Sequence, residues 1–384
     1  MKKSVLCIPL LVFSSIGLGS CQDKPSEVII SEVLEGSGSN CALELYNLSP
    51  NEITLDSYSI EIRFSEEKKV SISLEGYTIP SEQTFVISSA SANDTIKAKA
   101  QFVSDQLMFN GNQLILLKKG KKTLDIIGVA DYYAGGWYSD VTLARKKEHL
   151  VGRKEFDEYD WIRYVQDNTN YLGTIEVSIT ERELLEGPKL TDKYLNLTEY
   201  SKPAPTGTGY VGTGGLMDVT VAYYVDGDTT GFNYSNTAEI QKLDVSQGTK
   251  MRYQNIDTPE SYEGNIQEFG LVAKAYTKSR LSSASRIRVQ SVEDGSVKET
   301  FDRMLGWVWA DDHLLNFDIV KRGYSNVAFS AVDIMTYKDV SYTNFLYHAQ
   351  LYAQKRGLGT HGEVDPNWDY ENNKVKDGIH GNEK

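Results

Sequence analysis

Hydrophobic and polar residues alternate in short runs through the first half of this chain, and turn-forming residues separate the runs. Clear examples are residues 28–30, 60–62, 85–87 and 113–117. Alternate residues of a strand point to opposite faces, so short alternating runs with turns between them are typical of a β-sandwich. We therefore predict a mainly β domain, folded as a sandwich, over residues 27–175.

The pattern changes in the second half, where strands come first and helices follow. Residues 219–224 and 251–256 alternate like strands, and each run ends in a turn that carries carboxylates. Apolar residues then recur near helical spacing in residues 266–281, 314–323 and 343–356. This order predicts an α+β domain over residues 217–360.

The stretches that flank the second domain differ from both domains in composition. Residues 176–216 mix charges and then become rich in Pro and Gly, which predicts a flexible linker. Residues 361–384 are mostly polar, which predicts a loose C-terminal tail. The sequence contains no internal repeats.

The N-terminus has the order of an export signal. Lys2 and Lys3 give a basic start, residues 4–20 are apolar and small, and Cys21 ends the run. The Leu-Gly-Ser-Cys ending resembles a bacterial lipobox, which implies cleavage before Cys21 and lipid on its thiol. We expect residues 1–20 to be a signal peptide, residues 21–26 to be a lipidated tether, and the exported protein to be anchored to the bacterial membrane on its extracellular side. An ordinary signal peptide with an incidental cysteine is the alternative.

The composition excludes some classes of protein. Of 384 residues, 40 are Lys or Arg and 53 are Asp or Glu, so the net charge is −13. That charge excludes a wholly basic nucleic-acid coat but permits a local site for an anionic ligand. After residue 25 no apolar run reaches about 18 residues, which excludes a polytopic membrane protein. Cys41 would remain after processing as a structural thiol, since one thiol cannot form an intramolecular disulfide.

Carboxylates at the ends of two predicted strands suggest a metal site in the second domain. Asp228 and Asp257 each follow a strand, and rigid strand ends can deliver side chains to one place. Two carboxylates and a backbone carbonyl form a set of hard oxygen ligands that suits Ca²⁺ and leaves room for water. Glu260 lies three residues beyond Asp257, close enough to act as a base towards an adjacent water. Single carboxylates at strand ends are more often solvated turn formers, so the argument depends on the whole set.

Two arginines complete a set of groups suited to phosphodiester hydrolysis. Arg252 precedes Asp257 by five residues, and Arg303 lies just before another predicted strand. A guanidinium can bind a phosphoryl group through two hydrogen bonds and can stabilise the charge that develops during transfer. Other basic residues could line a path for phosphates, although a solvated surface is their commoner role. These residues are Lys274, Lys278, Arg280, Arg286 and Arg288.

The ordered set resembles the staphylococcal nuclease, or thermonuclease, family over residues 217–360. The matching motifs are Asp226-Gly227-Asp228-Thr229, then Arg252 with Asp257-Thr258-Pro259-Glu260, then Arg303 ahead of residues 305–311. The resemblance implies an OB-fold barrel with three helices. It also implies Ca²⁺-dependent cleavage of DNA and RNA that leaves 3′-phosphate ends.

The same resemblance implies a role for each matching residue. The implied metal ligands are the carboxylates of Asp228 and Asp257 and the backbone carbonyl of Thr258. Asp226 would lie behind these ligands and act through water. Glu260 would be the general base that activates water, while Arg252 and Arg303 would bind the scissile phosphate and stabilise its developing charge.

The sequence departs from the family pattern at positions expected to contact the nucleotide. Where the family often has Lys-Tyr-Gly before its second arginine, this chain has Thr300-Phe301-Asp302. Phe329 and Ala331 stand where family members often carry Tyr. We therefore expect weaker affinity for the substrate or a different preference. Asp302 could also compete with phosphate for Arg303.

The first domain resembles the lamin tail domain over residues 27–175. The resemblance is carried by two patterned stretches and a closing part, which are residues 30–47, residues 109–128, and residues 142–146 with Trp161 and residues 172–173. It implies an immunoglobulin-like sandwich used for binding or spacing. The sequence does not indicate which ligand this domain would bind.

Together these features predict a surface-anchored bacterial nuclease that hydrolyses phosphodiester bonds in extracellular DNA, RNA or both. Two alternatives remain open, a noncatalytic lipoprotein that binds nucleic acid or a surface ligand, and a phosphodiesterase for small nucleotides. An intact set of Glu260, Arg252 and Arg303 disfavours the noncatalytic alternative. The sequence does not decide whether DNA or RNA is preferred, or whether cleavage is endonucleolytic or exonucleolytic. It also does not decide the oligomeric state, or whether the metal is Ca²⁺ or another hard divalent cation.

Overall fold

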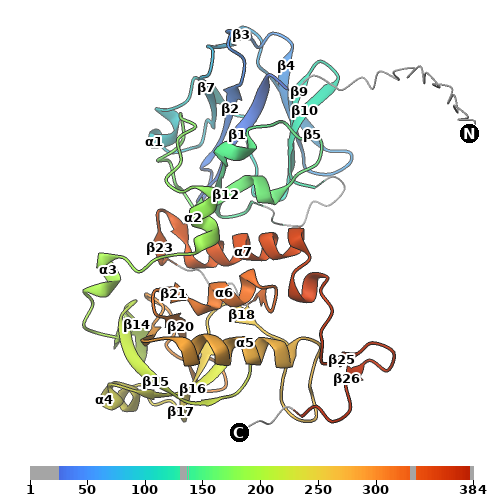
Figure 1. The fold of residues 1–384 in the computed structure, drawn as a ribbon. Helices are drawn as coiled ribbons and strands as arrows, with labels where there is room; N and C mark the ends of the chain where they lie inside the picture. Colours follow the sequence, from blue (N-terminus) through green and yellow to red (C-terminus); the bar gives the residue numbers. More distant parts are fainter. Residues whose placement is uncertain (1–25, 130–135, 137, 329–333, 381–384) are drawn as a thin grey trace, which may run out of the picture.

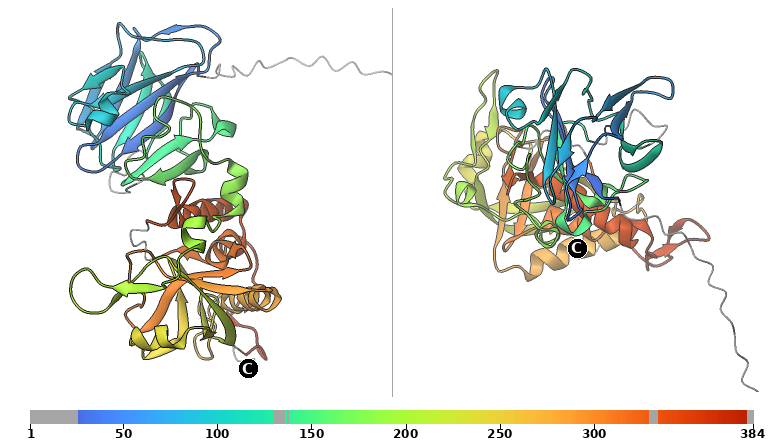
Figure 2. Two further views of the ribbon diagram at one scale, coloured as in Figure 1. Left: turned by 90° about the vertical axis from the view of Figure 1, so that its left-hand side faces the viewer. Right: turned by 90° about the horizontal axis from the view of Figure 1, so that it is seen from above.

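The computed structural model describes residues 26–129, 136, 138–328 and 334–380. Cys21, Phe329 and Ala331 lie outside the described residues, so what the sequence predicts for them stays a prediction. The described chain forms two domains that lie one above the other along a common axis (Figures 1 and 2). We call them the sandwich domain and the barrel domain. Within the described residues, no helix has both the length and the hydrophobicity needed to cross a membrane.

Two β-sheets face each other in the sandwich domain and enclose its hydrophobic core (Figure 1). The larger sheet has the order β12 (Trp161–Val165), β11 (Val141–Arg145), β1 (Val28–Glu35), β2 (Cys41–Asn47), β7 (Thr84–Ser89) and β8 (Phe102–Ser104). The smaller sheet has the order β10 (Lys122–Ile127), β9 (Leu114–Lys119), β4 (Tyr58–Arg63) and β5 (Lys69–Ser73). Buried side chains such as Leu43, Ile60 and Ile115 belong to its core. The predicted β-sandwich is confirmed.

The outer face of the larger sheet is also covered, which explains why β1 is buried along its whole length. Ile96 of the short helix α1 (Asp94–Lys97) and Leu172 pack with Leu34 and Val86 of the sheet. A small ribbon of β3 (Ile53–Thr54) and β6 (Thr78–Ile79) lies at the far end of the domain (Figure 1). When both faces of a sheet are covered, successive residues of its strands are buried, so these strands need not alternate between apolar and polar residues.

Five strands of the second domain close into a barrel. Their order is β17 (Gln247–Tyr253), β16 (Thr229–Tyr234), β15 (Leu216–Tyr224), β19 (Ile287–Gln290) and β20 (Arg303–Ala310). A parallel pairing of β17 with β20 closes the ring, and β21 (His313–Leu314) extends the sheet beyond β20. Phe232, Met251 and Val289 lie in its buried core. A closed five-stranded barrel with helices is the OB-fold arrangement, so the predicted architecture is confirmed.

The three predicted helices are α5 (Gly270–Ser283), α6 (Leu315–Lys321) and α7 (Tyr342–Arg356), and a short α4 (Thr237–Lys242) precedes them. Ser341 caps α7, because its side chain accepts a hydrogen bond from the Asn344 N–H at 3.0 Å. Gly357 ends α7 at φ +63°, a backbone conformation that favours glycine. Two small ribbons complete the domain, β18 (Ile256–Asp257) with β22 (Asn326–Val327), and β23 (Thr336–Tyr337) with β24 (Val340–Ser341).

The sandwich and barrel domains share a continuous buried surface through α7, which lies between them in Figure 1. Ile162 and Tyr164 of β12 belong to the same hydrophobic cluster as Phe345 of α7. The backbone N–H of Arg163 donates to Nε2 of the buried His348 at 3.2 Å. The first domain is therefore packed against the second along β12 and α7.

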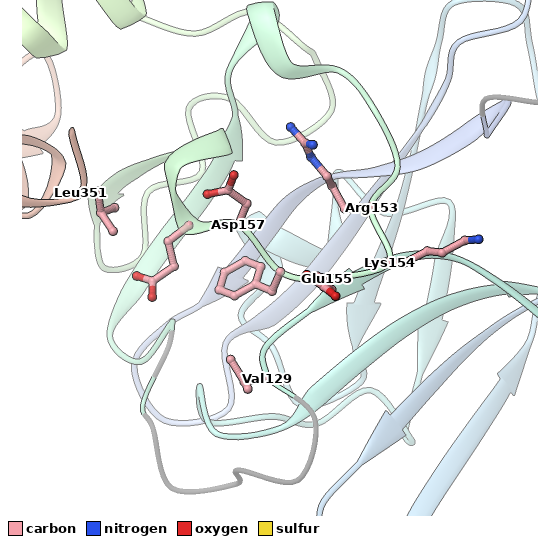
Figure 3. A pocket seen from close by; sticks show the side chains of 8 residues that line it. Val129, Arg153, Lys154, Glu155, Asp157 and Leu351 are labelled. Carbon is pink, nitrogen blue, oxygen red and sulfur yellow. The ribbon is translucent and has the colours of Figure 1, made fainter. Parts of the chain in front are cut away.

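A pocket of about 520 Å³ opens beside this contact. Figure 3 shows Leu351 of α7 on one side and the loop that carries Arg153 and Asp157 on the other. Asp157 also pairs with Lys355 of α7 at 2.6 Å. None of the lining residues is among the site residues predicted from the sequence; they are Val129, Arg153, Lys154, Glu155, Phe156, Asp157, Glu158 and Leu351.

The segment predicted as a flexible linker, residues 176–216, is folded instead. It forms α2 (Glu181–Glu186), α3 (Asp192–Leu195) and a hairpin of β13 (Ser201–Pro203) with β14 (Tyr210–Gly212). Thr180 and Glu183 form a capping box at the start of α2. Four widely spaced side chains, Ile179, Leu184, Tyr194 and Tyr200, are buried in the core cluster of the barrel domain. The prediction was wrong because isolated apolar residues produce no periodic pattern.

The segment predicted as a loose tail, residues 361–384, also folds within its described part. β25 (Trp368–Asp369) and β26 (Lys374–Val375) form a short hairpin. Trp368 is 9% exposed and Asp365 is 1% exposed. Asp369 accepts hydrogen bonds from the N–H groups of Glu371 and Asn372. The polar residues here build turns, although most of them remain exposed.

Candidate active site

Asp228 lies in the turn between β15 and β16, where the barrel wall fixes its position. Its side chain is 1% exposed. Oδ1 accepts a hydrogen bond from Thr229 Oγ1 at 3.0 Å, and Oδ2 accepts from the N–H and Oγ1 of Thr258 at 2.6 and 3.1 Å. Gly227 allows this approach, because a Cβ there would lie 2.8 Å from atoms of Thr258 and Ala273. The turn therefore holds a buried carboxylate against the segment that follows β18.

Arg252 of β17 joins Asp228 to Asp257. The register pairs Thr229 with Arg252 across β16 and β17, so the arginine lies beside Asp228. Its Nη1 donates to Asp228, and its Nη2 donates to Asp257 and to the carbonyl oxygen of Ile256, the last at 3.0 Å. The Arg252 side chain is 14% exposed and that of Asp257 is 55% exposed. This group of charges is therefore open to solvent on its Asp257 side.

Arg303 begins β20, which pairs in parallel with the strand of the first arginine. Its Nε and its backbone N–H donate to Oε1 of Glu299 at 2.8 and 3.2 Å. Asp302 instead accepts from Lys298 Nζ at 2.8 Å and from the Ser246 N–H at 2.6 Å. The predicted competition of Asp302 for Arg303 is wrong, because the turn directs Asp302 to other donors. Sequence reasoning missed Glu299, because its contact depends on the turn that brings it back to Arg303.

Phe301, one of the departures from the family pattern, projects into solvent. It is 71% exposed, and its ring centre lies 5.8 Å from the guanidinium of Arg303. A phenyl ring offers an apolar face but no hydroxyl donor. The side chain at this position therefore cannot donate a hydrogen bond to a ligand.

Glu260 lies in the loop after β18, and its backbone is held on both sides by Gln267. The Glu260 N–H donates to Gln267 Oε1 at 3.0 Å, and its carbonyl accepts from the Gln267 N–H at 2.9 Å. Burial raises the pKa of Glu260, the charges of Asp228 and Asp257 raise it further, and the two arginines of the site act against them. Thr258, two residues before Glu260, bonds Asp228 through its N–H and hydroxyl, so the loop of Glu260 starts at the buried carboxylate.

Asp226 lies behind Asp228 in the same turn. Its Oδ1 accepts from the Asp228 N–H at 3.2 Å. Burial raises the pKa of Asp226 to about 7, the negative charge of Asp228 acts in the same direction, and Arg252 opposes both. Asp226 thus contacts the backbone N–H of Asp228, which fits a supporting position in the turn.

The structure brings the predicted metal ligands together only in part. Among the described residues, no three His, Cys, Asp or Glu side chains are grouped so that they could hold a metal ion. The guanidinium of Arg252 is the cation that bridges Asp228 and Asp257. The donor chemistry nevertheless fits a hard divalent cation, because two carboxylates from strand ends converge and the outer one is solvated.

Three of the five basic residues considered as a phosphate path have carboxylate partners. The pairs are Arg280 with Asp318 at 3.0 Å, Arg286 with Asp218 at 2.6 Å, and Arg288 with Asp312 at 3.4 Å. Their charge is therefore compensated within the protein. Arg286, with a side chain that is 59% exposed, fits the alternative of a solvated charged surface, whereas the side chain of Arg288 is only 7% exposed. The three paired arginines do not support a continuous phosphate path.

The fold and this group of residues define a nuclease domain of the thermonuclease class. Residues 250–360 match the family model described as staphylococcal nuclease homologue, and residues 22–131 match the model described as lamin tail domain. The chain thus contains a lamin tail domain followed by a thermonuclease-like nuclease domain. The turn of Asp226 and Asp228 precedes the matched residues, and the pairing of β16 with β17 connects it to them.

Three curated proteins are similar to the chain. It is 28% identical over 217 residues to endonuclease YhcR of Bacillus subtilis (strain 168), which covers 54% of this chain and 16% of that protein. It is 29% identical over 114 residues to the thermonuclease of Staphylococcus intermedius, which covers 29% of this chain and 62% of that protein. It is 28% identical over 116 residues to the SPbeta prophage-derived endonuclease YokF of Bacillus subtilis (strain 168), and the aligned residues cover 30% of this chain and 35% of that protein. The chain spans less than two thirds of the length of each of these relatives.

Proposed function

We propose that this protein is a Ca²⁺-dependent nuclease that hydrolyses phosphodiester bonds in DNA, RNA or both at the bacterial surface. The observation that supports it best is the bridging of Asp228 and Asp257 by Arg252 at a solvent-exposed edge of the barrel, where the loop of Glu260 begins. Arg303 lies on β20, the strand that pairs with that of Arg252. The names of the similar proteins, thermonuclease and endonuclease, belong to the same class of activity.

Glu260 is the proposed general base. Burial and the neighbouring aspartates raise the pKa of its carboxyl group, which makes it a better proton acceptor than a fully exposed glutamate. It would take a proton from water while the water oxygen forms a bond to phosphorus and the bond from phosphorus to the 5′ oxygen breaks. The leaving oxygen gains a proton, and the products are a 3′-phosphate end and a 5′-hydroxyl end.

Arg252 and Arg303 would bind the scissile phosphate and stabilise its developing charge. Glu299 binds Arg303 through Nε, and a guanidinium bound in this way keeps its Nη groups as donors. Arg252 already contacts two carboxylates through its Nη groups. We expect it to exchange at least one of these contacts for a phosphate oxygen when substrate binds.

Asp228, Asp257 and the backbone carbonyl of Thr258 would hold Ca²⁺. When bound, the ion would supply positive charge beside the phosphate and compensate the two aspartates. Asp228 suits this position because the Thr258 N–H and hydroxyl orient its carboxylate from behind. Asp257 suits it because its side chain is half exposed and can reorient.

The anchor at Cys21 is part of the same proposal. Cleavage before Cys21 and acylation of its thiol would place both domains outside the cell. Expression of the full chain and of Cys21→Ser in a bacterial host, followed by membrane fractionation and mass analysis of the N-terminal peptide, tests this point. A soluble unmodified protein in both cases would leave an ordinary signal peptide as the explanation.

The activity is tested by digesting plasmid DNA and RNA with residues 22–384, in Ca²⁺ or in chelator. Glu260→Gln keeps the shape of the side chain and removes the base, so we expect cleavage to fall at least about 100-fold. Glu263→Gln is the matched control, because it makes the same change on an exposed residue of the same loop. End-labelling of the products distinguishes 3′-phosphate from 5′-phosphate ends.

The outcomes separate the alternatives. Cleavage of polymers with Ca²⁺ that Glu260→Gln abolishes supports the proposal. Hydrolysis of a mononucleotide diester without cleavage of polymers would instead indicate a small-nucleotide phosphodiesterase. If the folded protein binds nucleic acid but does not cleave it in the presence of any divalent metal, the noncatalytic alternative is indicated. Full activity in Glu260→Gln would keep the nuclease and overturn the assignment of its base.

A further inference from the structure

The C-terminal segment packs on the loop that carries Glu260, although it lies beyond the residues that match the nuclease family model. We call residues 258–269 the base loop. The hairpin of β25 and β26 lies next to the start of α5, where the base loop ends (Figure 1). Tyr370 Oη donates to Glu268, and the Phe269 N–H donates to Asp365 Oδ2 at 2.6 Å. Two contacts therefore attach the segment to the end of the base loop.

Asp365 is the centre of this attachment. Asp365 is 1% exposed. Besides Phe269, its Oδ1 accepts from the Asn367 N–H at 2.8 Å, and its own N–H donates to Tyr370 Oη at 2.9 Å. A buried carboxylate is costly unless it is hydrogen-bonded, and here backbone N–H groups from two separate segments satisfy it. Asp365 therefore joins the hairpin to the base loop in a fixed geometry.

Phe269 is the residue of the base loop that depends on this contact. Its φ is +65°, a left-handed conformation that is uncommon for a bulky residue. Its ring is 2% exposed, and its ring centre lies 6.3 Å from that of Tyr324. Such a backbone persists only where its surroundings hold it. The carboxylate of Asp365 and the buried ring hold the backbone and the side chain respectively.

A short chain of contacts connects Phe269 to Glu260. The Gly270 N–H donates to the Gln267 carbonyl at 3.0 Å, and Gln267 bonds both backbone groups of Glu260. Gly270 also lies so close to Glu260 that a Cβ there would be 1.9 Å from the Glu260 carbonyl oxygen. The backbone of Glu260 is therefore held against the start of α5, and Asp365 fixes that junction from outside.

We propose that Asp365 is a positioning residue for Glu260, which it holds at the phosphate site by fixing the end of the base loop. This inference rests on the proposed function of Glu260 as general base. Asp365 acts through Phe269 and Gln267 and not on the substrate. A base must lie within about 2.6–3.2 Å of the proton it accepts, and a displacement of about 1 Å can lower a rate about 100-fold.

The test is Asp365→Asn in residues 22–384 with Ca²⁺. Asparagine keeps the shape of the side chain but presents an NH₂ group to one of the two N–H donors. We expect kcat on plasmid DNA to fall about 10- to 100-fold, while KM stays within about twofold. Hydrogen exchange at the amides of residues 260–269 should become faster. Asp377→Asn is the matched control, because it removes only an exposed ion pair with Lys374 in the same segment.

A double mutant shows whether the effect passes through Glu260. In a Glu260→Gln background, Asp365→Asn should lower the residual rate no further, because the base that it positions is already absent. A further loss of the same size would overturn the proposal and indicate a general effect on stability. Tyr370→Phe is the milder variant if Asp365→Asn does not fold, and it should change kcat and loop exchange in the same direction.

The exchange measurement separates failure of this inference from failure of the proposed function. If the unchanged protein cleaves nothing, faster exchange of residues 260–269 in Asp365→Asn still supports the attachment of the base loop. Unchanged exchange in a folded Asp365→Asn overturns the inference whether or not the protein is a nuclease. Unchanged kcat together with faster exchange also overturns it, because the loop would then move without displacing the base.

Discussion

An arginine between two aspartates occurs in each domain, and the two arrangements differ in burial. The sandwich trio is Asp125, Arg145 and Asp160, and the barrel trio is Asp228, Arg252 and Asp257. The side chains of the sandwich trio are at most 1% exposed, whereas Asp257 in the barrel trio is 55% exposed. Similar residues therefore lie in a closed network in one domain and at an open edge in the other.

The sandwich trio is also saturated with hydrogen bonds from the protein. Asp125 accepts from three backbone N–H groups in addition to the Arg145 guanidinium. Asp160 accepts two hydrogen bonds from Arg153, at 2.7 and 3.1 Å. Arg145 further donates to two backbone carbonyls and lies over the ring of Trp161 at 4.2 Å. This arrangement serves structure, since its polar atoms are already satisfied within the fold.

The directions of the pKa shifts separate the trios as well. Burial lowers the pKa of Arg145 and raises that of Asp125 despite their pairing, so loss of hydration outweighs attraction in the sandwich trio. Burial also lowers the pKa of Arg252, but the surrounding carboxylates outweigh it and the net shift is upward. In the barrel trio, attraction to the carboxylates therefore outweighs the loss of hydration. Burial and saturation, rather than residue type, distinguish a structural network from a site that can bind ions.

The largest expected effect comes from breaking the sandwich trio. Arg145→Leu leaves Asp125 and Asp160 buried without their shared cation, and we expect the free energy of unfolding to fall by about 3–5 kcal/mol. Urea unfolding followed by tryptophan fluorescence measures this loss. Cleavage per folded molecule, assayed below the transition, should stay near that of the unchanged protein. A loss of activity without a loss of stability would contradict the structural role of the trio.

Changing the barrel trio should have the opposite profile. Arg252→Lys keeps one positive charge but loses the planar fork that contacts two groups at once. We expect kcat/KM on DNA to fall about 100- to 1000-fold, with a small change in the urea midpoint. A destabilisation as large as that of Arg145→Leu would show that Arg252 is mainly structural.

Two glutamates of the sandwich show what burial does without a matching arginine. Glu32 and Glu44 pair across β1 and β2 and are both buried. Burial raises the pKa of Glu44 from 4.5 to about 7, although bonds from Ser31 and Gly173 act against it. The folded state therefore keeps a proton that the unfolded state releases, so this group makes stability fall as pH rises from about 4.5 to about 7 and level off above.

The expected loss of stability between pH 5 and pH 8 is about 2–3 kcal/mol, because the pH rises through about two units of the shift and each unit corresponds to about 1.4 kcal/mol. Urea unfolding at pH 5 and pH 8 measures it. Glu44→Gln imitates the protonated side chain and should reduce the difference between the two pH values. An unchanged difference in Glu44→Gln would mean that another group causes the pH dependence.

The sequence could predict both sheets because their alternation is local, and it could predict the group around Asp228 because strand ends are placed by the barrel. It did not predict the sandwich trio, although Asp125 and Arg145 lie in stretches that carry the lamin tail resemblance, because charged residues are expected to be solvated. Nor could it predict the burial of Tyr194 in the supposed linker, which depends on a partner surface far away in sequence. Glu299 and Asp365 were missed for a similar reason, since each acts through the geometry of a turn.

The smallest expected effect comes from a third Arg–Asp contact that has good geometry and little burial. Arg286 donates to Asp218 through Nε at 2.6 Å and Nη2 at 3.0 Å, and the two side chains are 59% and 53% exposed. Water solvates both groups, so Arg286→Gln should change the free energy of unfolding by less than about 1 kcal/mol. High salt should remove what remains of this effect, whereas the effect of Arg145→Leu should persist, because screening acts mainly on exposed charges. If Arg286→Gln and Arg145→Leu lower the free energy of unfolding by similar amounts, the geometry of pairing, and not burial, determines the stability. Burial would then no longer explain the difference between the sandwich trio and the barrel trio.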